Sequence, residues 1–591
     1  MTSDRSADPL RRALLAGAAA LPWAGCARVD APRYGGGWLG AGHERGHWLR
    51  DPSRTPPPDV QRRAGVIVIG AGIAGLAAAR ALMKAGIDDV QVFELEDGAG
   101  GNSRAHRLGG MACPQGAHYL PLPGAQATEV AELLAELGLS RDEAGKTVYD
   151  ERHLCHSPQE RLFIDGQWVD GLLPPVDALP ASVRAATRAQ YQRFGAAVQA
   201  AGRDRAFCVP TARASASAPT SARVASLGTV SFDSWLDEQG FSAPALRWYL
   251  DYCCRDDFGA GAGFVSAWAG LHYFASRHGF HAPGADDADA KGRPQADDIR
   301  RPPPEGDEET SGGRAFPHES GAVLTWPQGN AWLSDRLAAP LGPRLHTGHV
   351  ALRVHEGRHE VSVELWNIAA QRLEAWRARQ VVLALPLFVA ARLLESPPGA
   401  LGAAAALLHS APWLVANLHL KEALTDRGGA APAWDNVQYG SATLGYVDAM
   451  HQSTRPHPGP TVLTAYWALG GNSPRELREH RQRLLDAPWS AWADAVLREL
   501  EPAHPEIGAR LQSIDLMRYG HAMAIPAPGV HGHPALRALA GRGGQSGGRV
   551  HFAHSDLSGY SVFEEAFFHG ERAGRAVGQA LRAPRQARPV S

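Results

Sequence analysis

A glycine-rich turn between a strand and a helix is the strongest chemical signal in this 591-residue chain. Residues 66–69 (Val-Ile-Val-Ile) form an unbroken β-branched run, which predicts a strand buried on both faces. A G-x-G-x-x-G turn follows at once, and a strongly helix-forming run follows the turn. In such a turn the glycines permit a tight bend, a close approach of backbone to a pyrophosphate and close helix packing. The residues expected to hold a dinucleotide here are Gly70, Gly72, Ile73, Ala74 and Gly75.

A dinucleotide-binding site also needs an acid at the end of its second strand, and the sequence has one there. Residues 90–93 (Val-Gln-Val-Phe) predict a second strand, which ends at Glu94. An acid about 20 residues past the glycines accepts hydrogen bonds from ribose hydroxyls. Glu96 is the alternative by spacing. Strand, turn, helix and terminal acid together predict a bound dinucleotide rather than a glycine-rich turn without a ligand.

A pair of glycines follows Glu94 after a short spacer. With Gly100 and Gly101 in this place, the chain resembles the flavin-containing amine oxidoreductase superfamily. That superfamily includes monoamine and polyamine oxidases, protoporphyrinogen oxidase and the carotenoid desaturases, and it carries Gly-Gly-Arg after the acid. Asn102 occupies the position of the family arginine, and Arg104 is the candidate to replace it.

Two later segments strengthen the resemblance. Residues 381–386 (Val-Val-Leu-Ala-Leu-Pro) resemble the family's late strand near the flavin, and Val350 lies where the family contacts adenine through a backbone strand. Residues 550–553 (Val-His-Phe-Ala), with a helix expected from 565 to 573, resemble the segment that closes the flavin domain.

The closing segment also implies individual contacts. By resemblance, Asp556 bonds the ribityl or pyrophosphate region, and the residues up to Val562 and Phe563 lie beside the isoalloxazine ring. An NAD-only dehydrogenase needs just the first βαβ unit, so the extra segments favour FAD as the cofactor.

The order of the motifs predicts the fold class and the domains. We expect an α/β chain with a discontinuous Rossmann-type FAD-binding domain and an α+β substrate-binding domain. The FAD-binding domain is expected at 64–120, 318–400 and 547–585, and the substrate-binding domain at 121–317 and 401–546. Residues 281–317 are rich in Gly, Pro, Asp and Glu and predict a disordered insertion. Residues 211–226 predict a flexible loop.

The resemblance leaves the catalytic residues less defined. Many amine-oxidising members hold a lysine on a substrate-domain strand, and the matching position falls on Val415 or within two residues of it. Lys421 lies about 20 Å away at the usual strand rise, so the lysine is predicted to be absent. Asn417 is a candidate to hold a water in its place.

Aromatic and titratable residues supply the other candidates. Tyr560 and Tyr519 could flank the flavin as the family's aromatic rings do. His118 and His521 are candidate catalytic groups near the flavin, or structural histidines. Asp435 is either a turn residue or a partner for a cationic amine. The aromatic-rich stretch 248–274 suits either a packed core or helices over a cofactor.

Three functions remain open on these residues. The first is hydride transfer from an amine or amino-acid-like substrate to flavin N5. The second is dehydrogenation of a carbon–carbon bond in a hydrophobic substrate, which the predicted absence of the lysine favours. The third is a flavin-bound protein without turnover. The electron acceptor, whether oxygen, a quinone or a redox protein, is not identified by the sequence.

The N-terminal residues predict an export signal. Residues 9–27 hold a basic pair, Arg11-Arg12, before a short apolar run that ends in small residues. The layout resembles a twin-arginine export signal over residues 1–29, followed by a Gly/Pro/Arg-rich linker over 30–63. Ala-Gly-Cys at Cys26 resembles the end of a lipoprotein cleavage site, so a lipid anchor there stays open. The expected location is the periplasm.

Composition excludes other classes. Net charge is −2, which gives no basis for nucleic-acid binding. The six cysteines show no C-x-x-C spacing, so no metal site is expected. The expected partner is a small-molecule substrate.

Overall fold

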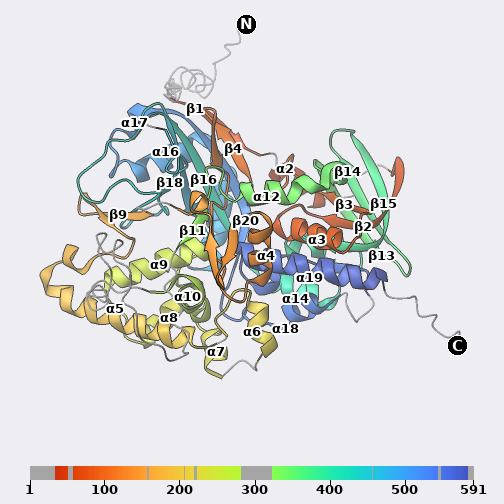
Figure 1. The fold of residues 1–591 in the computed structure, drawn as a ribbon, viewed down its shortest axis with the longest axis horizontal. Coiled ribbons are helices and arrows are strands. Elements are labelled where there is room, and N and C mark those ends of the chain that lie inside the picture. Colours follow the sequence, from red (N-terminus) through yellow and green to blue (C-terminus); the bar gives the residue numbers. More distant parts are fainter. Residues whose placement is uncertain are drawn as a thin grey trace, which may run out of the picture.

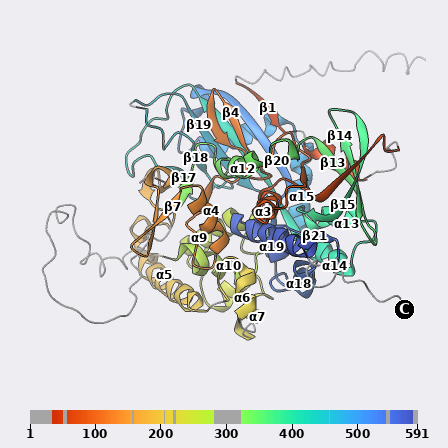
Figure 2. The ribbon, with the colours of Figure 1, turned by 45° about the vertical axis from the view of Figure 1, so that its right-hand side comes forward.

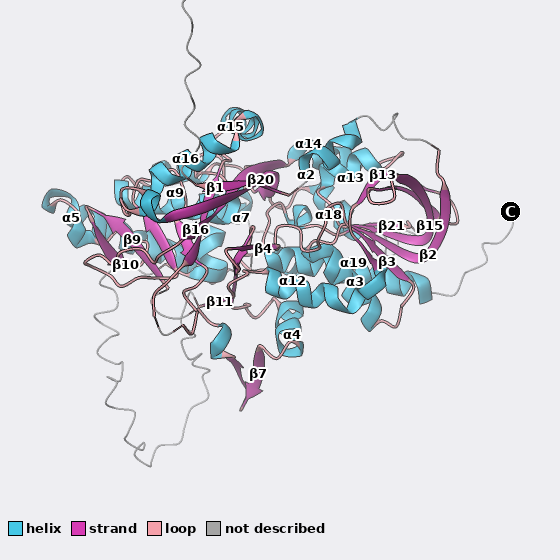
Figure 3. Cartoon of the chain, turned by 90° about the horizontal axis from the view of Figure 1, so that it is seen from above, coloured by secondary structure: helices cyan, strands magenta, loops and turns pink. Residues whose placement is uncertain are grey.

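Two sheets lie side by side and are joined through a central region of loops and helices (Figures 1 and 3). The computed structural model describes residues 34–40, 42–50, 57–155, 159–204, 206–217, 222–280, 322–455, 457–542 and 548–582. The predicted signal segment 1–29 and the predicted insertion 281–317 lie outside the described residues. Among the described helices, none is long and apolar enough to cross a bilayer.

The smaller sheet is the predicted nucleotide-binding one. Its order is β12-β3-β2-β15-β14-β13, with β21 beside the end of β15, and β3, β2, β15 and β21 run parallel. Its strands are β2 (Val60–Ile69), β3 (Val90–Phe93), β12 (Leu345–His346), β13 (His349–Glu356), β14 (Val361–Asn367), β15 (Arg372–Leu383) and β21 (Val550–Phe552). Its helices are α3 (Ile73–Lys84), α12 (Ala331–Ala338), α13 (Leu387–Leu393), α14 (Gly399–Leu407), α18 (Pro534–Gly541) and α19 (Phe563–Arg582).

Helices cover both faces of this sheet because its central strands are apolar on both sides. Val66 and Val68 point into one buried cluster with α3 and α19, while Ile67 and Ile69 point into another with α13, α14 and α18. Helices α3 and α19 come from opposite ends of the chain and lie side by side in both views (Figures 1 and 2). A Cβ at Gly570 would stand 2.2 Å from the Ala74 carbonyl oxygen, so glycine is what lets the helices approach so closely.

The larger sheet carries the predicted substrate domain. Within the described residues its order is β1-β20-β16-β19-β18-β17-β9-β10. Its strands are β1 (Gly35–Leu39), β9 (Glu160–Ile164), β10 (Gln167–Asp170), β16 (His409–Leu420), β17 (Asp435–Gln438), β18 (Tyr446–Asp448), β19 (Thr461–Ala468) and β20 (Leu511–Ile525). One face packs against α15 (Pro474–Asp486), α16 (Trp489–Leu500) and α17 (Ile507–Arg510). The other faces α5 (Ala181–Gly202), α8 (Phe232–Glu238), α9 (Pro244–Phe258) and α10 (Ala267–Tyr273).

Short helices and strands lie outside the two large sheets. These are α2 (Gly42–His47), β4 (Ala105–Leu108), β5 (Met111–Pro114), β6 (Tyr119–Pro121), α4 (Thr128–Glu136), β7 (Ser140–Glu143), β8 (Lys146–Tyr149), α6 (Thr211–Ser217), α7 (Ala222–Leu227) and β11 (Val323–Thr325).

The segment predicted as a linker is partly structured. β1 pairs in parallel with β20, with Trp38 opposite Leu516. In α2, the Arg45 guanidinium donates to the Leu95 carbonyl at 3.0 Å and to the Asp97 carboxylate at 2.8 Å, on the smaller sheet's side. Residues 35–40 and 42–50 therefore form an arm that ties the two halves together, and β2 begins at Val60, inside the predicted linker.

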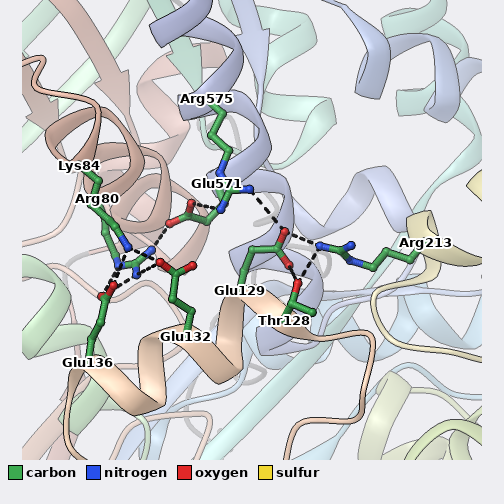
Figure 4. A network of polar contacts seen from close by, with 9 residues as sticks. All are labelled: Arg80, Lys84, Thr128, Glu129, Glu132, Glu136, Arg213, Glu571 and Arg575. Atoms are coloured by element: carbon green, nitrogen blue, oxygen red, sulfur yellow. Dashed lines mark hydrogen bonds and ion pairs between the residues drawn. The ribbon is translucent and has the colours of Figure 1, made fainter.

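The segment predicted as a flexible loop, 211–226, instead holds α6 and α7. Arg213 of α6 is anchored to Glu129 of α4 at 2.6 Å. On the other side of α4, the buried Arg80 of α3 pairs with Glu136 at 2.5 Å and with Glu571 of α19 (Figure 4). This network of charges holds α3, α4, α6 and α19 against one another. The glycine turn directly precedes α3, so the network also supports the turn.

Candidate active site

A cavity of about 380 Å³ runs between the two sheets. One end is lined by the glycine turn and Glu94, and the other by residues of β16, β19 and α9. The sequence motifs and the substrate-domain strand thus line one continuous space.

The glycine turn forms the first wall. Gly70, Gly72, Ile73 and Ala74 line the cavity, whereas Gly75 lies behind them, where a Cβ would stand 1.8 Å from the Gly70 carbonyl oxygen. The first hydrogen bond of α3 runs from Leu76 N to Gly72 O, so the preceding N–H groups of the helix are unused by it. They offer donors and positive helix dipole to a diphosphate.

Glu94 ends β3 at the cavity, as predicted. Its carboxylate accepts hydrogen bonds from Ala71 N at 2.8 Å and from Glu96 N at 3.0 Å. Burial raises the pKa of Glu94, although these two N–H groups oppose the shift. Of the two acids considered, Glu94 is the one that lines the cavity, and its fixed position suits a ribose.

The Gly100-Gly101 loop forms the adjacent wall. Gly100, Gly101 and Asn102 line the cavity, and Asn102 donates its Nδ2 to the Ala522 carbonyl at 2.7 Å. Arg104 does not line it; this side chain bonds the Gly101 carbonyl at 3.0 Å and pairs with Glu96 at 3.3 Å. Arg104 therefore braces the loop, which differs from the expected direct replacement of the family arginine.

The closing segment meets the same cavity. Asp556, Val562 and Phe563 all line it. Asp556 accepts from Leu387 N at 2.8 Å and lies 3.1 Å from His554 Nδ1. Burial alone would raise the pKa of Asp556, but His554 and this N–H outweigh it and hold the pKa below its usual value. Asp556 is thus an acceptor at neutral pH.

Val350, expected to contact adenine, is buried in a small apolar cluster, and its side chain does not line the cavity. The neighbouring His349 N bonds the Glu94 carbonyl at 2.8 Å. A contact through the backbone at Val350 stays a prediction.

His118 is at the centre of an aromatic group at the other end of the cavity. Its ring stacks on Tyr466, with centroids 4.4 Å apart, and lies 5.3 Å from Trp434 and 5.0 Å from Tyr119. Burial lowers the pKa of His118 to about 3, so the ring is neutral at physiological pH. It can exchange hydrogen bonds with a ligand but does not present a positive charge.

Two carboxylates that the sequence did not single out line the same end. Asp256 and Asp257 stand in the last turn of α9, inside the stretch read as core or cofactor-facing helices. Asp257 is paired with Arg277 at 3.3 Å, and Arg277 also pairs with Glu564 at 3.0 Å. Asp256 forms no ion pair with another described residue, and it lines the cavity.

The position predicted for the family lysine is apolar. Val415 is buried, lines the cavity and lies opposite Tyr466 and Met517 in the sheet. Lys421 follows the end of β16, and no lysine of the described ranges lines the cavity. Asn417 is fully buried and accepts from the Thr464 hydroxyl at 2.8 Å, away from the cavity lining. The Asn417 Nδ2 has no hydrogen-bond partner among the described residues, and the role of Asn417 in holding a water stays a prediction.

Of three further candidates, His521 and Tyr519 line the cavity and Tyr560 does not. His521 lines the cavity but is exposed at its rim, 4.6 Å from Phe388. Tyr519 lines the cavity and donates to the Gln115 carbonyl at 2.9 Å. Tyr560 does not line it: its ring is buried and its hydroxyl donates to Glu565 at 2.8 Å. Tyr560 is a core residue, and among the described residues Tyr119, Tyr466 and Tyr519 are the tyrosines that line the cavity.

The fold and the cavity define a dinucleotide-binding oxidoreductase with a separate substrate domain. The family model of flavin-containing amine oxidoreductases matches residues 73–578, and the chain belongs to that family. Protein anon-37Cs of Drosophila melanogaster is 34% identical over 79 residues, which is 13% of this chain and 16% of that protein.

Solved structures have the same fold at low identity. A putrescine oxidase variant has a TM-score of 0.60 at 18% identity, covering 88% of this chain and 99% of its own. Cyclohexylamine oxidase from Brevibacterium oxydans scores 0.58 at 18%, covering 88% and 100%. A protoporphyrinogen oxidase-like protein from Exiguobacterium scores 0.53 at 14%, covering 88% and 99%.

The protein is therefore an FAD-dependent oxidoreductase, and its residues fit the cofactor. The α3 N-terminus suits the diphosphate, Glu94 the ribose, and Asp556 with the start of α19 the flavin end. Within the described residues no group of His, Cys, Asp and Glu could hold a metal ion.

Proposed function

We propose that this enzyme oxidises an amine, removing two electrons and two protons from an H–C–N–H group to give an imine. Bound FAD supplies the acceptor for the hydride, and the protein supplies binding and orientation. The observation that carries the proposal is the lining of the cavity's far end, where Asp256 and Asp257 stand beside aromatic rings. Carboxylates beside aromatic faces suit an ammonium group.

The neutral state of His118 supports the same reaction. An amine must lose its ammonium proton before a hydride can leave the adjacent carbon. A cationic histidine would repel the ammonium form and could return the proton, whereas neutral His118 does neither. Its stacking on Tyr466 also holds the ring in one orientation against the substrate.

The second candidate is dehydrogenation of a carbon–carbon bond. It is favoured by Val415, which puts an apolar side chain where amine-oxidising relatives carry a lysine. A hydrophobic substrate would nevertheless leave the buried Asp256 carboxyl group with the Tyr119 hydroxyl as its hydrogen-bond partner but with no cation among the described residues, at a cost in free energy. Amine oxidation is therefore the better match to this cavity.

Anaerobic reduction of the flavin distinguishes amine oxidation from carbon–carbon dehydrogenation. Purified holoenzyme is mixed without oxygen with primary amines, zwitterionic amino acids and polyenes, and flavin bleaching is followed. Photoreduction first establishes that the flavin can be reduced at all. We expect amines to bleach it; bleaching by polyenes alone would overturn the proposal, and bleaching by none would favour a non-catalytic flavoprotein. Readmitting air, then a quinone, identifies the electron acceptor.

We also propose export to the periplasm through the twin-arginine route, supported by Arg11-Arg12 before the short apolar run. That route suits a flavoprotein because it carries folded cargo. Fractionation of an Arg11→Lys, Arg12→Lys variant tests it, and unchanged periplasmic delivery would refute it. A Cys26→Ser variant that leaves the membrane fraction unchanged would exclude a lipid anchor.

A further inference from the structure

We propose that Asn330 is a flavin-binding residue, whose side-chain oxygen accepts a hydrogen bond from the imide N–H of the isoalloxazine ring. The inference concerns the cofactor, so it holds whichever substrate the enzyme oxidises. The sequence motifs do not mark this position, which only the folded structure brings to the cavity.

Asn330 directly precedes α12, is 1% exposed and lines the cavity. Its backbone N–H donates to the Ala117 carbonyl at 3.0 Å, one residue before His118. One turn further along α12, the Ser334 hydroxyl donates to the Ser103 carbonyl at 2.8 Å, in the loop that follows the glycine pair. The start of α12 therefore contacts both the cofactor-binding loop and the segment that carries the aromatic end of the cavity.

The side-chain amide of Asn330 has one satisfied end and one unsatisfied end. Its Nδ2 donates to the Tyr119 carbonyl at 2.8 Å, while its Oδ1 has no hydrogen-bond partner among the described residues. Exchanging the two atoms would place Oδ1 against the Tyr119 carbonyl oxygen, and both atoms are acceptors, so the carbonyl fixes the orientation of the amide. A buried acceptor without a donor costs free energy. The Oδ1 atom therefore calls for a donor from a bound molecule.

The helix that Asn330 precedes does not use this oxygen either. Asparagine is among the most favoured N-cap residues, because its side-chain oxygen accepts hydrogen bonds from the first free N–H groups of a helix. Here Asn330 has φ −67° and ψ −2° and makes no side-chain capping bond to α12. Local structure thus leaves the oxygen without a role, and a molecule in the cavity is the remaining source of a donor.

A permanently bound cofactor suits this oxygen better than a substrate does. A substrate leaves after each turnover and would leave the buried acceptor without a donor again, whereas FAD stays. The sugar hydroxyls of FAD have acceptors in Glu94 and Asp556, which both line the cavity. Of the N–H groups of FAD, the adenine amino group belongs to the end of the molecule near Glu94. The imide N–H belongs to the flavin end, and it is the donor left for Asn330.

An uncharged acceptor also suits a ring that gains negative charge when it is reduced. A carboxylate in the same place would repel the reduced ring and oppose its formation. At this end of the cavity the Asp257 carboxylate is already paired with Arg277 at 3.3 Å. The amide of Asn330 offers an oxygen acceptor without adding a charge, so it can hold the ring in both redox states.

Binding of two flavins to the full-length apoprotein tests the hydrogen bond. FAD and 3-methyl-FAD, in which a methyl group replaces the imide hydrogen, are titrated into the wild type and Asn330→Ala, and fluorescence quenching gives Kd. We expect the wild type to bind 3-methyl-FAD about 5- to 100-fold more weakly than FAD. Asn330→Ala should bind FAD about 3- to 10-fold more weakly than the wild type does, and should distinguish the two flavins by less than about threefold.

Thr325→Val is the matched control. Thr325 is 2% exposed and does not line the cavity, and its hydroxyl donates to the His118 carbonyl at 2.7 Å. That carbonyl lies between the two carbonyls that Asn330 holds. The control variant therefore removes a hydrogen bond to the same segment and keeps the proposed acceptor, so it should retain the wild-type preference for FAD over 3-methyl-FAD.

ADP serves as a second control, because it lacks the flavin ring and should bind the wild type and Asn330→Ala within about twofold. Equal binding of FAD and 3-methyl-FAD by the wild type would overturn the proposal, whatever the variants do. An Asn330→Ala variant that keeps the wild-type preference, or that loses affinity for ADP and FAD alike, would also overturn it. Far-UV circular dichroism establishes that each variant is folded before its Kd is compared.

Discussion

A single added methyl group should separate cofactor binding from folding at the glycine turn. Gly72 has φ −71° and ψ −179°, which any residue adopts, and a Cβ built on it would meet only the Gly101 Cα, at 3.9 Å. Gly72→Ala therefore fits the protein without a clash. The methyl group would project where the backbone must approach the diphosphate.

The magnitudes follow from those contacts. As the N-cap of α3, an alanine costs about 1 kcal/mol or less of apoprotein stability. Crowding a well-packed interface typically costs about 1–3 kcal/mol, which corresponds to a Kd for FAD raised about 5- to 150-fold. Gly75→Ala is the contrasting variant, because its Cβ would stand 1.8 Å from the Gly70 carbonyl oxygen. That variant should destabilise the apoprotein itself by about 2 kcal/mol or more.

The assay uses apoprotein prepared by removing the flavin. FAD fluorescence quenching gives Kd, and urea unfolding of the apoprotein gives stability. The reasoning is refuted if Gly72→Ala binds FAD like the wild type, or if it loses as much apoprotein stability as Gly75→Ala.

Three further predictions concern the substrate end and the core. Because burial and nearby carboxylates raise the pKa of Asp256 to about 7, this group is neutral below that pH and charged above it. The affinity for an amine in its ammonium form should therefore rise between pH 6 and 8, and a flat profile in rapid-reaction titrations would contradict this. Arg277→Met leaves Asp257 and Glu564 buried without their cation and should cost about 3–5 kcal/mol in urea unfolding; unchanged stability would show that the triad matters little. Tyr560→Phe removes a buried hydrogen bond to Glu565 and should cost about 1–3 kcal/mol while flavin reduction stays within twofold; a tenfold slower reduction at unchanged stability would restore Tyr560 to the active site.

The cofactor half of the site could be predicted because its signals are local. The turn at Gly70 and the acid at Glu94 are each bound to one strand end, so a short window of sequence fixes both position and role. The same holds for Asp556, Val562 and Phe563, which the closing segment carries directly into the cavity. Here local structure determines where the side chains point.

The substrate end of the site could not be predicted from the sequence, because tertiary packing creates it. Asp256, His118 and Tyr466 are far apart in sequence, and only the tertiary fold brings them to one end of the cavity. His118 was a candidate and lines the cavity, whereas Asp435, the candidate partner for a cationic amine, does not line it. Asn417 lies on β16, as expected, but it is two residues after Val415 and its side chain does not line the cavity. Tyr560, a candidate to flank the flavin, is instead buried in the core.

The N-terminal arm was missed for a different reason. Residues 35–39 are mostly glycine, so they show neither apolar alternation nor strand propensity. Their strand exists because β20 offers an unpaired edge, with five register pairs from Gly35 to Leu39.

The close fit of α19 against α3 also has a consequence for biosynthesis. The glycine turn leaves the ribosome early, but the helix that covers α3 and completes the cavity is made last. At 5–20 residues per second, the interval is on the order of half a minute to two minutes. Throughout that time the alanine-rich face of α3 has no α19 against it. Stable capture of FAD is therefore an event that follows translation, and the nascent chain must be kept from aggregating until its final helix arrives.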